Sequence, residues 1–184
     1  MVRDDETVLI TIRSGMRSDG PSLQAIERSA GEKFRQVGLN HVADDEPPSV
    51  ESLAIYADAG RSWVAIDETG NPIGYLIFDE IDGNAHISQM SVHPDWQGRG
   101  VGRMLLSRAQ TWVIDNGRSA ITLTTFDSVP WNRSLYEHLG FHVLSEGDIG
   151  PELIAIRNSE TDRGLAPDER VCMRLDVHAG FKAL

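Results

Sequence analysis

The segment from residue 62 to residue 92 constrains the fold most, because three strand-like stretches follow one another there with very short connections. The stretches are Ser62–Asp67, Ile73–Asp79 and Ala85–Val92. The turns between them, Glu68–Asn71 and Asp82–Asn84, are built from Gly, Asn, Asp and other turn-forming residues. Strands joined by turns this short pair with their neighbours in the antiparallel sense. The sequence therefore predicts an antiparallel meander.

Helix and strand patterns alternate along the rest of the chain. Further strands are predicted at Val8–Arg13, Ala120–Thr124, Phe141–Ser145 and Arg170–Val177; helices are predicted after Asp19–Pro21 up to about Gly38, from an N-cap at Ser49 to about Gly60, at Val101–Asn116, at Val129–Leu139 and around Leu153–Asn158, with an acidic loop at His41–Pro48. The 184 residues are expected to fold as one domain, residues 1–184. We expect a mixed α/β fold with a mostly antiparallel central sheet flanked by helices.

The composition indicates which kinds of partner and which cellular compartment to expect. The formal net charge is −11, whereas proteins that bind nucleic acid carry basic patches, so no nucleic-acid partner is expected. The same charge would attract protonated amines or would simply keep the protein in solution. No apolar run of about 18 residues is present, and Met1–Glu6 is charged, so neither a membrane span nor a secretory signal is expected. The single cysteine, Cys172, suits a reducing compartment, and we expect a cytoplasmic protein.

A glycine-rich turn joins the meander to a long amphipathic helix. Gly98, Gly100 and Gly102 alternate there, accompanied by Arg99 and Arg103. The first N–H groups of a helix are unpaired and the helix dipole makes that end positive, which favours an anion. Glycines let a phosphate approach those N–H groups closely. The sequence therefore predicts an anion site, most naturally for a diphosphate.

Two other phosphate-binding motifs fit this turn poorly. A P-loop requires Gly-Lys-Ser/Thr after its glycines, and this turn does not have it. A dinucleotide fingerprint has the spacing G-x-G-x-x-G after a buried parallel strand, whereas here the glycines alternate after an antiparallel meander.

Two motifs, in order and about thirty residues apart, carry a family resemblance. Gln97-Gly98-Arg99-Gly100-Val101-Gly102 resembles the Gln/Arg-x-x-Gly-x-Gly/Ala acetyl-CoA signature of the GNAT superfamily of N-acetyltransferases, and Val92-His93-Pro94 matches the strand end that precedes it. The segment from Asn132 to Phe141 is similar to the family's Asn-x-x-x-Tyr-x-x-x-Gly-Phe segment. The resemblance covers roughly Ala85 to Phe141. It implies the acyl-CoA N-acyltransferase fold, with splayed fourth and fifth strands, and transfer of an acetyl group to an amine by direct attack on the thioester.

The resemblance also implies binding roles. Met90 and Val92 would offer backbone hydrogen bonds to pantetheine, Asn132 would touch the pantetheine arm, and Tyr136 would lie near the thioester sulfur. The diphosphate would be held by N–H groups of the turn, with the residues Gln97, Gly98, Arg99, Gly100, Val101, Gly102 and Arg103. Acetyl-CoA is expected as the co-substrate, and no metal ion is expected.

Acetyl transfer from a thioester to an amine needs a proton for the departing thiolate and a base for the amine. Tyr136 is the candidate acid because a phenol is neutral at pH 7, although it could instead only pack its helix or contact the cofactor. His86, eleven residues before Gln97, is the candidate base. Some family members carry a catalytic Glu or His at that offset, and an imidazole pKa near 6.5 suits the task. His86 could also face solvent, and a water chain, bridged for example by Ser88, could replace it.

Three further residues have weaker interpretations. A backbone N–H near Met90 could hold the oxyanion, and His93 is interpreted as part of a turn. Cys172 could be a nucleophile, but it lies in the apolar stretch Val171-Cys172-Met173, where a thiol usually packs in the core.

The acceptor is less constrained than the donor. By resemblance, Gln24–Glu51 and Glu146–Arg170 would select it, and the acidic run Asp44–Glu46 could receive an ammonium group or be a solvated loop. A small-molecule amine is favoured, and a peptide amine stays open, as does a homodimer. Two other classes of function are alternatives: a non-catalytic acyl-CoA sensor or regulatory domain, and a phosphate- or nucleotide-binding protein unrelated to coenzyme A.

Overall fold

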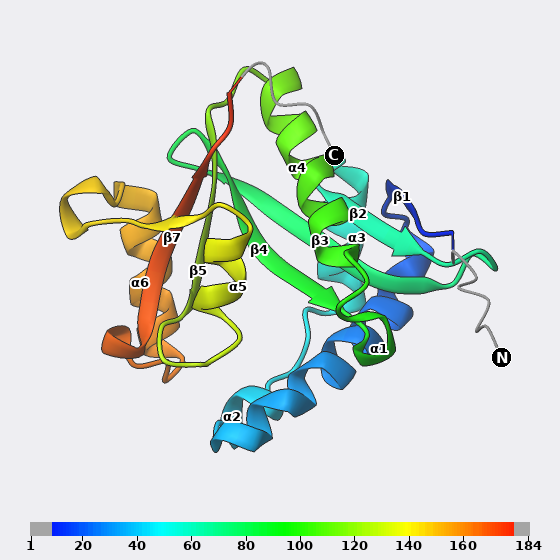
Figure 1. Ribbon diagram of the computed structural model, residues 1–184, viewed down its shortest axis with the longest axis horizontal. Coiled ribbons are helices and arrows are strands. Elements are labelled where there is room, and N and C mark those ends of the chain that lie inside the picture. The colour runs from blue at the N-terminus through cyan, green and yellow to red at the C-terminus, as the bar shows by residue number, and fades with distance from the viewer. Residues whose placement is uncertain (1–8, 179–184) are drawn as a thin grey trace, which may run out of the picture. The chain divides into compact units, whose positions relative to one another are not determined.

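The computed structural model describes residues 9–178, and Val8 and the charged segment Met1–Glu6 lie outside them. One seven-stranded sheet has the order β1-β2-β3-β4-β5-β7-β6 (Figure 1). Its strands are β1 Thr11–Ser14, β2 Ser62–Ile66, β3 Pro72–Ile81, β4 Asn84–Val92, β5 Ala120–Phe126, β6 His142–Val143 and β7 Arg170–Asp176. β4 is parallel to β5, while the pairs β1–β2, β2–β3, β5–β7 and β6–β7 are antiparallel. The predicted fold class is confirmed.

The chain divides into two compact units. The first comprises the described residues up to Ile77 together with Gln89–Leu105, and the second comprises Phe78–Ser88 together with the described residues from Leu106 onward. Strands β3 and β4 and helix α4 (Val101–Asp115) contribute residues to both units. In the part of the chain from residue 9 to residue 178, no helix is both long and apolar enough to cross a membrane.

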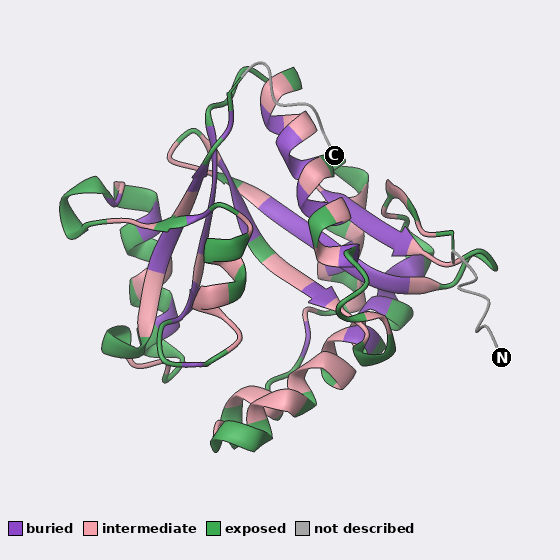
Figure 2. Ribbon diagram, in the orientation of Figure 1, coloured by how far each residue is buried: buried purple, intermediate pink, exposed green. Residues whose placement is uncertain are grey.

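The core of the first unit lies between two helices and the strands β2 and β3. Helix α1 spans Gly20–Gly31 and α3 spans Val50–Asp58. The buried residues of this core are Leu23, Ile26, Leu53, Val64, Tyr75 and Ile77. Figure 2 shows the matching purple stretches on the strands. The near-helical spacing of the apolar residues in α1 thus marks the face that packs on the sheet.

The helix ends in the first unit agree with their capping signals and add one short helix. The Ser49 Oγ accepts a hydrogen bond from the Ser52 N–H at 3.1 Å, as an N-cap should. The helix predicted to reach Gly38 continues after α1 as a 3-10 helix, Glu32–Val37, and ends at Gly38 with φ 80°. Part of the loop predicted at His41–Pro48 is instead a short helix, α2 (Asn40–Ala43).

The second unit is built on β5, β7 and the helix α6 (Pro151–Asp162). Its apolar cluster consists of Ile149, Leu153 and Cys172, with Ile81, Leu144 and Ile156 packed against it. Trp112 of α4 packs edge-on against Phe78 of β3, with ring centroids 4.6 Å apart. Helix α5 is Arg133–His138, shorter than the predicted Val129–Leu139, because the Asn132 N–H closes a turn onto the Val129 carbonyl at 3.0 Å.

The start of α6 is fixed by a residue of the β3–β4 turn. The Asp82 carboxylate accepts hydrogen bonds from the backbone N–H groups of Glu152 and Leu153 at 3.1 and 3.0 Å. A Cβ at Gly150 would lie 2.3 Å from that carboxylate, so a larger residue there would displace the Asp82 carboxylate from the cap. This long-range cap explains why α6, which spans Pro151–Asp162, begins before the predicted Leu153.

Candidate functional site

The glycine-rich turn lies in the first unit, between the end of β4 and the start of α4. After Val92 the chain makes a 3-10 turn, Pro94–Trp96, which His93 caps: its Nδ1 accepts from the Asp95 N–H at 3.3 Å. The interpretation of His93 as turn structure is confirmed. Gly98 and Gly100 follow with φ values of 75° and 82°. This left-handed backbone is strained for any residue with a Cβ, so the turn requires glycine at both positions.

Gly74 of β3 sets where α4 begins. A Cβ at Gly74 would come within 3.1 Å of the Ser91 carbonyl oxygen and of a Val101 methyl group. The His93 N–H also donates to the Ile73 carbonyl at 2.9 Å. The helix start therefore lies directly against the backbone of β3, and a side chain at position 74 would push it away. The sequence analysis did not recognise this role of Gly74.

The turn has the donors and the space that a diphosphate requires. The first α-helical hydrogen bond at this end of α4 runs from the Met104 N–H to the Gly100 carbonyl at 3.0 Å. The N–H groups of the first turn precede it and have no acceptor within the helix. Apart from its chain neighbours and the backbone of its own helix, no atom of residues 9–178 lies within 4 Å of the place where a Cβ would stand at Gly98, Gly100 or Gly102. The residues present therefore fit an anion held by backbone groups.

Two other members of the signature make contacts within the turn or with β4. The Arg99 guanidinium lies over the Trp96 ring, 5.1 Å from its centroid, on the exposed surface. The Gln97 Nε2 donates to the Val92 carbonyl at 3.0 Å and so ties the turn to the end of β4. Arg103 is exposed on α4. The structure thus brings together, in one unit, the turn and the strand residues predicted to bind pantetheine.

Met90, the other strand residue predicted to bind pantetheine, hydrogen-bonds to a side chain through its backbone N–H. Its N–H donates to the Oε1 of the preceding residue, Gln89, at 3.1 Å. The Nε2 of the same Gln89 donates to the Glu27 carboxylate on α1. Gln89 therefore connects the Met90 amide to a carboxylate within the first unit.

Glu27 is the functional candidate that the sequence analysis missed. It is half-buried, and Tyr75 of β3 and Gln89 of β4 donate hydrogen bonds to its two carboxylate oxygens. Burial raises the pKa of Glu27, as does the charge of Asp45, while the two hydrogen bonds and the charge of Arg28 lower it. A signal was present, because Glu27 falls at the i+4 position from Leu23, on the apolar face of α1.

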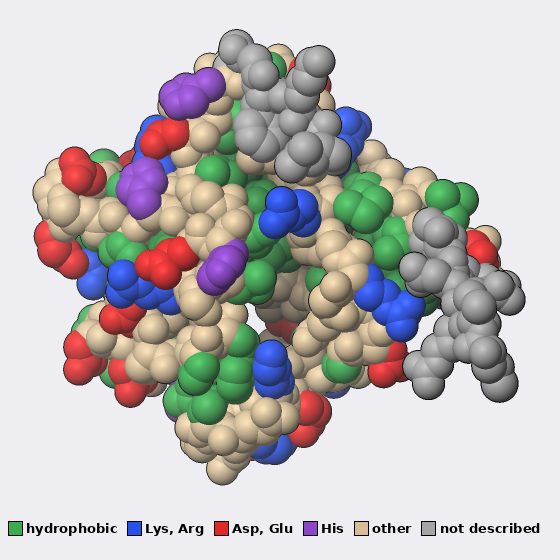
Figure 3. Space-filling view, viewed as in Figure 1, with side chains coloured by type: hydrophobic (Ala, Val, Ile, Leu, Met, Phe, Trp, Pro, Cys, Tyr) green, Lys and Arg blue, Asp and Glu red, His purple; other side chains and the backbone are tan. Residues whose placement is uncertain are grey.

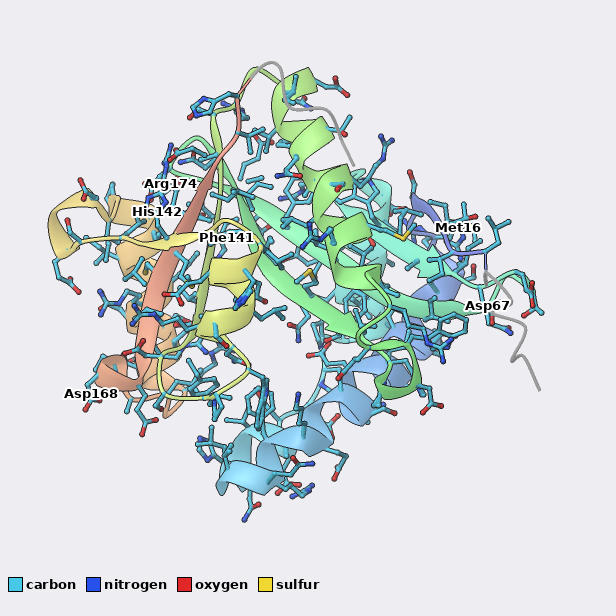
Figure 4. All side chains as sticks on the ribbon, viewed as in Figure 1. Met16, Asp67, Phe141, His142, Asp168 and Arg174 are labelled. Atoms are coloured by element: carbon cyan, nitrogen blue, oxygen red, sulfur yellow. The ribbon has the colours of Figure 1, made fainter. Side chains whose placement is uncertain are left out.

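Tyr136 lies on α5 in the second unit. Its ring packs edge-on against Phe141, with centroids 5.6 Å apart, and Phe141, labelled in Figure 4, comes after Leu139 and Gly140 at the end of that helix. Burial raises the pKa of the Tyr136 hydroxyl to about 12, although the charge of Arg170 lowers it. The phenol therefore keeps its proton at neutral pH. Asn132 sits one turn earlier, and its carbonyl accepts the Tyr136 N–H at 3.2 Å.

His86 is buried in β4, in the second unit, with 3% of its surface exposed. Its Nδ1 and the Thr122 Oγ1 of β5 are 3.0 Å apart. Burial lowers the pKa of His86 to about 4, against the raising effect of Glu160, Asp79 and Asp82. The imidazole is therefore neutral at pH 7, and the alternative of a solvent-facing His86 is wrong.

The pairing of β4 with β5 ends early. Within the second unit the ladder consists of Ala85 with Ile121 and His86 with Thr122. Ile87 and Ser88 continue β4 beyond it, and the Ser88 Oγ donates to the Asp79 carboxylate of β3 at 2.7 Å. The early end of this ladder agrees with the separation of these strands that the family resemblance implies.

The remaining sequence candidates have structural partners. In the acidic run Asp44–Glu46, Asp44 pairs with Arg35 at 2.6 Å and Glu46 with Arg28 at 3.1 Å. Burial raises the pKa of Cys172 to about 11, so it is a protonated core thiol rather than a thiolate nucleophile. Figure 3 shows both acidic and basic side chains scattered over one face of the molecule. Among residues 9–178, no three His, Cys, Asp or Glu side chains are grouped so that they could hold a metal ion.

Comparisons with known proteins agree with this geometry. The family model described as "Acetyltransferase (GNAT) family" matches residues 23–141. The chain is 29% identical over 112 residues to aminoglycoside N(6')-acetyltransferase type 1 of Stenotrophomonas maltophilia, which covers 55% of this chain and 73% of that protein. It is 23% identical over 145 residues to the peptidyl-lysine N-acetyltransferase YjaB of Salmonella typhimurium, covering 77% and 90% of the two chains.

A solved structure shares the fold. The PaiA N-acetyltransferase of Thermoplasma acidophilum, crystallised with coenzyme A, superposes with a TM-score of 0.65. The match covers 91% of this chain and 99% of that one, at 15% sequence identity. An identity this low supports the fold alone.

Proposed function

The chain belongs to the GNAT family of acetyltransferases, and from that premise we propose that it transfers an acetyl group from acetyl-CoA to a primary amine of a small molecule or a peptide. Relatives named for acting on aminoglycosides and on peptidyl-lysine support an amine acceptor. The proposal treats the chain as one catalytic domain, because a single sheet runs through strands that contribute to both units. A cytoplasmic location is part of the proposal, since Cys172 is a buried free thiol.

One observation carries the proposal: a glycine turn opens α4, whose first N–H groups have no acceptor within the helix, and the space beside the glycines is open. In the proposal, the turn from Gln97 to Arg103 holds the diphosphate of acetyl-CoA, and the backbone of Met90 and Val92 binds pantetheine. Asn132 contacts the same arm. The acetyl-CoA thioester supplies the activated acyl group, and direct attack by the amine needs no covalent enzyme intermediate.

Tyr136 is proposed as the acid that protonates the departing thiolate. A phenol whose pKa is raised to about 12 is fully protonated at neutral pH. It can therefore give its proton to sulfur as the carbon–sulfur bond breaks and regain one from water. His86 is a candidate for the base, because it is neutral at pH 7, but a pKa of about 4 makes it a weak acceptor of protons.

Ligand-dependent melting tests this function. A ligand at 100 times its dissociation constant adds about 2.7 kcal/mol, and a protein of this size gains about 2–4 °C per kcal/mol. We expect acetyl-CoA to raise Tm by several degrees and NAD and ATP to leave it unchanged. Release of free coenzyme A thiol is then measured with an aminoglycoside, a lysine-containing peptide and an L-amino acid as acceptors.

The outcomes separate the alternatives. Stabilisation by ATP without stabilisation by acetyl-CoA contradicts the assignment and favours a nucleotide-binding protein. Stabilisation by acetyl-CoA with no thiol release for any amine favours the acyl-CoA sensor instead.

A further inference from the structure

Resting on the proposed acetyltransferase activity, we propose that Glu27 binds the ammonium group of the acceptor and takes its proton during transfer, with Tyr75 and Gln89 as positioning residues. All three residues belong to the first unit. They come from α1, β3 and β4, so three elements converge on one carboxylate.

The surroundings of Glu27 favour a cationic ligand. The two groups that donate hydrogen bonds to it, the Tyr75 hydroxyl and the Gln89 amide, are both neutral. The neighbouring cation, Arg28, directs its guanidinium at Glu46 instead, at 3.1 Å. A carboxylate that is half-buried among neutral donors is desolvated without a formal counter-charge in contact. An ammonium group would supply that charge.

The carboxylate is also suited to take a proton. Burial raises the pKa of Glu27, and the charge of Asp45 raises it further, while Tyr75, Gln89 and the charge of Arg28 act in the opposite direction. A carboxylate with a raised pKa is a stronger base than a solvated one. The Tyr75 hydroxyl keeps its own proton, because burial and the neighbouring Glu27 raise its pKa. Tyr75 therefore fixes the carboxylate and does not compete for the substrate proton.

Gln89 places this base next to the proposed donor site. Its amide bridges the Glu27 carboxylate and the Met90 N–H, which lies 3.1 Å from the Gln89 Oε1. The Met90 backbone is proposed to bind the acyl donor, and the Glu27 carboxylate the acceptor. The Gln89 side chain therefore lies between the group that binds one substrate and the group that binds the other. His86, the other candidate base, has only 3% of its surface exposed and is engaged by Thr122. Glu27 is the more accessible of the two.

The reaction balances without another reagent. The amine nitrogen forms a bond to the thioester carbon, and the carbon–sulfur bond breaks. The proton lost by nitrogen goes to the Glu27 carboxylate and then to solvent, while the thiolate takes a proton from Tyr136.

The test compares Glu27→Gln with the matched control Glu68→Gln. Both variants remove one negative charge from the first unit, but Glu68 is exposed in the β2–β3 turn, outside the cluster and outside the segments expected to select the acceptor. With the amine that gives the fastest wild-type thiol release, Glu27→Gln should lower kcat/KM by about 100-fold or more, the size of a lost general base. Glu68→Gln should stay within about twofold of wild type, since an exposed charge contributes little. Acetyl-CoA should still raise Tm of both variants as it does for wild type.

A pH series gives the signature of base catalysis. Raising the pH toward the pKa of the amine supplies neutral nucleophile, so the ratio of wild-type to Glu27→Gln activity should shrink. A ratio that stays constant points to a structural role and overturns the inference. Equal losses in both variants would assign the effect to general electrostatics and would overturn it too.

If Glu27→Gln does not fold, a measurement on the wild-type protein still tests the inference. Carbodiimide labelling of Glu27, mapped by mass spectrometry, should be suppressed by saturating amine substrate, and undiminished labelling overturns the inference. If the wild type releases no thiol with any amine, both the proposed acetyltransferase function and the proposed role of Glu27 are wrong. If the wild type is active and Glu27→Gln is equally active, only the proposed role of Glu27 is wrong.

Discussion

Alanine substitution in the glycine turn gives the sharpest test of the donor site. Gly98 and Gly100 have φ values of 75° and 82°, and Gly70, in the β2–β3 turn, has φ 85°. Within the described part of the chain, and leaving aside the neighbouring residues in the sequence, an added Cβ would meet no atom within 4 Å at any of the three positions. Gly70→Ala is therefore a matched control, with the same backbone and the same open space in a turn that the proposal leaves outside the site.

The cost in stability should be similar for all three variants. A non-glycine residue in the left-handed region costs roughly 1–2 kcal/mol, and no clash adds to it in the free protein. For a protein of this size, 1 kcal/mol corresponds to about 2–4 °C in Tm. We therefore expect Gly70→Ala, Gly98→Ala and Gly100→Ala each to melt about 2–8 °C below wild type.

Acetyl-CoA affinity should separate the variants. A methyl group at position 98 or 100 would occupy the open space through which a phosphate approaches the backbone N–H groups. A loss of about 1.4 kcal/mol raises Kd about tenfold. Isothermal titration calorimetry should give that increase for Gly98→Ala and Gly100→Ala, and no change for Gly70→Ala.

The comparison can refute the reasoning in two ways. Wild-type affinity in Gly98→Ala and Gly100→Ala, with the expected fall in Tm, would show that these glycines serve the turn and not a ligand. A tenfold loss in Gly70→Ala as well would show that affinity follows general stability rather than the space beside the turn.

Three further predictions concern the second unit. Tyr136→Phe should lower kcat about 100-fold or more with unchanged Kd for acetyl-CoA, and unchanged kcat would contradict its acid role. Arg170→Met should lower the free energy of unfolding in urea by about 3–5 kcal/mol, because it leaves the buried Glu160 carboxylate without its ion-pair partner. That carboxylate lies 2.7 Å from the Arg170 guanidinium, and 8% of the Glu160 side chain is exposed. The double variant Arg170→Met/Glu160→Gln should recover part of the lost stability. The pKa of His86 falls from 6.5 to about 4 on folding, so the unfolded chain binds more protons between those values. Stability should therefore drop by about 3 kcal/mol as the pH falls through that window, and urea unfolding of His86→Gln should lack that drop.

Local signals were enough to predict most of the fold. Alternating strands with short turns predicted β2, β3 and β4, and the apolar spacing from Val101 predicted α4. The N-cap at Ser49 was found because a cap is a contact between residues three apart, visible in the sequence itself. The turn proposed to bind the acyl donor belongs to the same class, since its backbone geometry depends on glycines that alternate within a few residues of the chain.

Contacts between residues far apart in the sequence could not be predicted from local patterns. The start of α6 depends on Asp82, 70 residues before Glu152. The position of α4 on β3 depends on Gly74 having no side chain, because Val101 comes within 3.1 Å of the place of its Cβ. Nothing near Gly74 in the sequence indicates which helix will approach it.

Glu27 lies between these two cases. Its place on the apolar face of α1, one residue after the buried Ile26, is visible in the sequence as a charge that breaks the helical pattern. Its partners are not, because Tyr75 and Gln89 lie 48 and 62 residues away. A charge on a buried face costs free energy unless partners satisfy it, so the break in the pattern predicts that partners exist before it can say which. In this chain a motif marks the proposed donor site and a violated pattern marks the proposed acceptor site, because glycine turns are local and a desolvated carboxylate requires several elements.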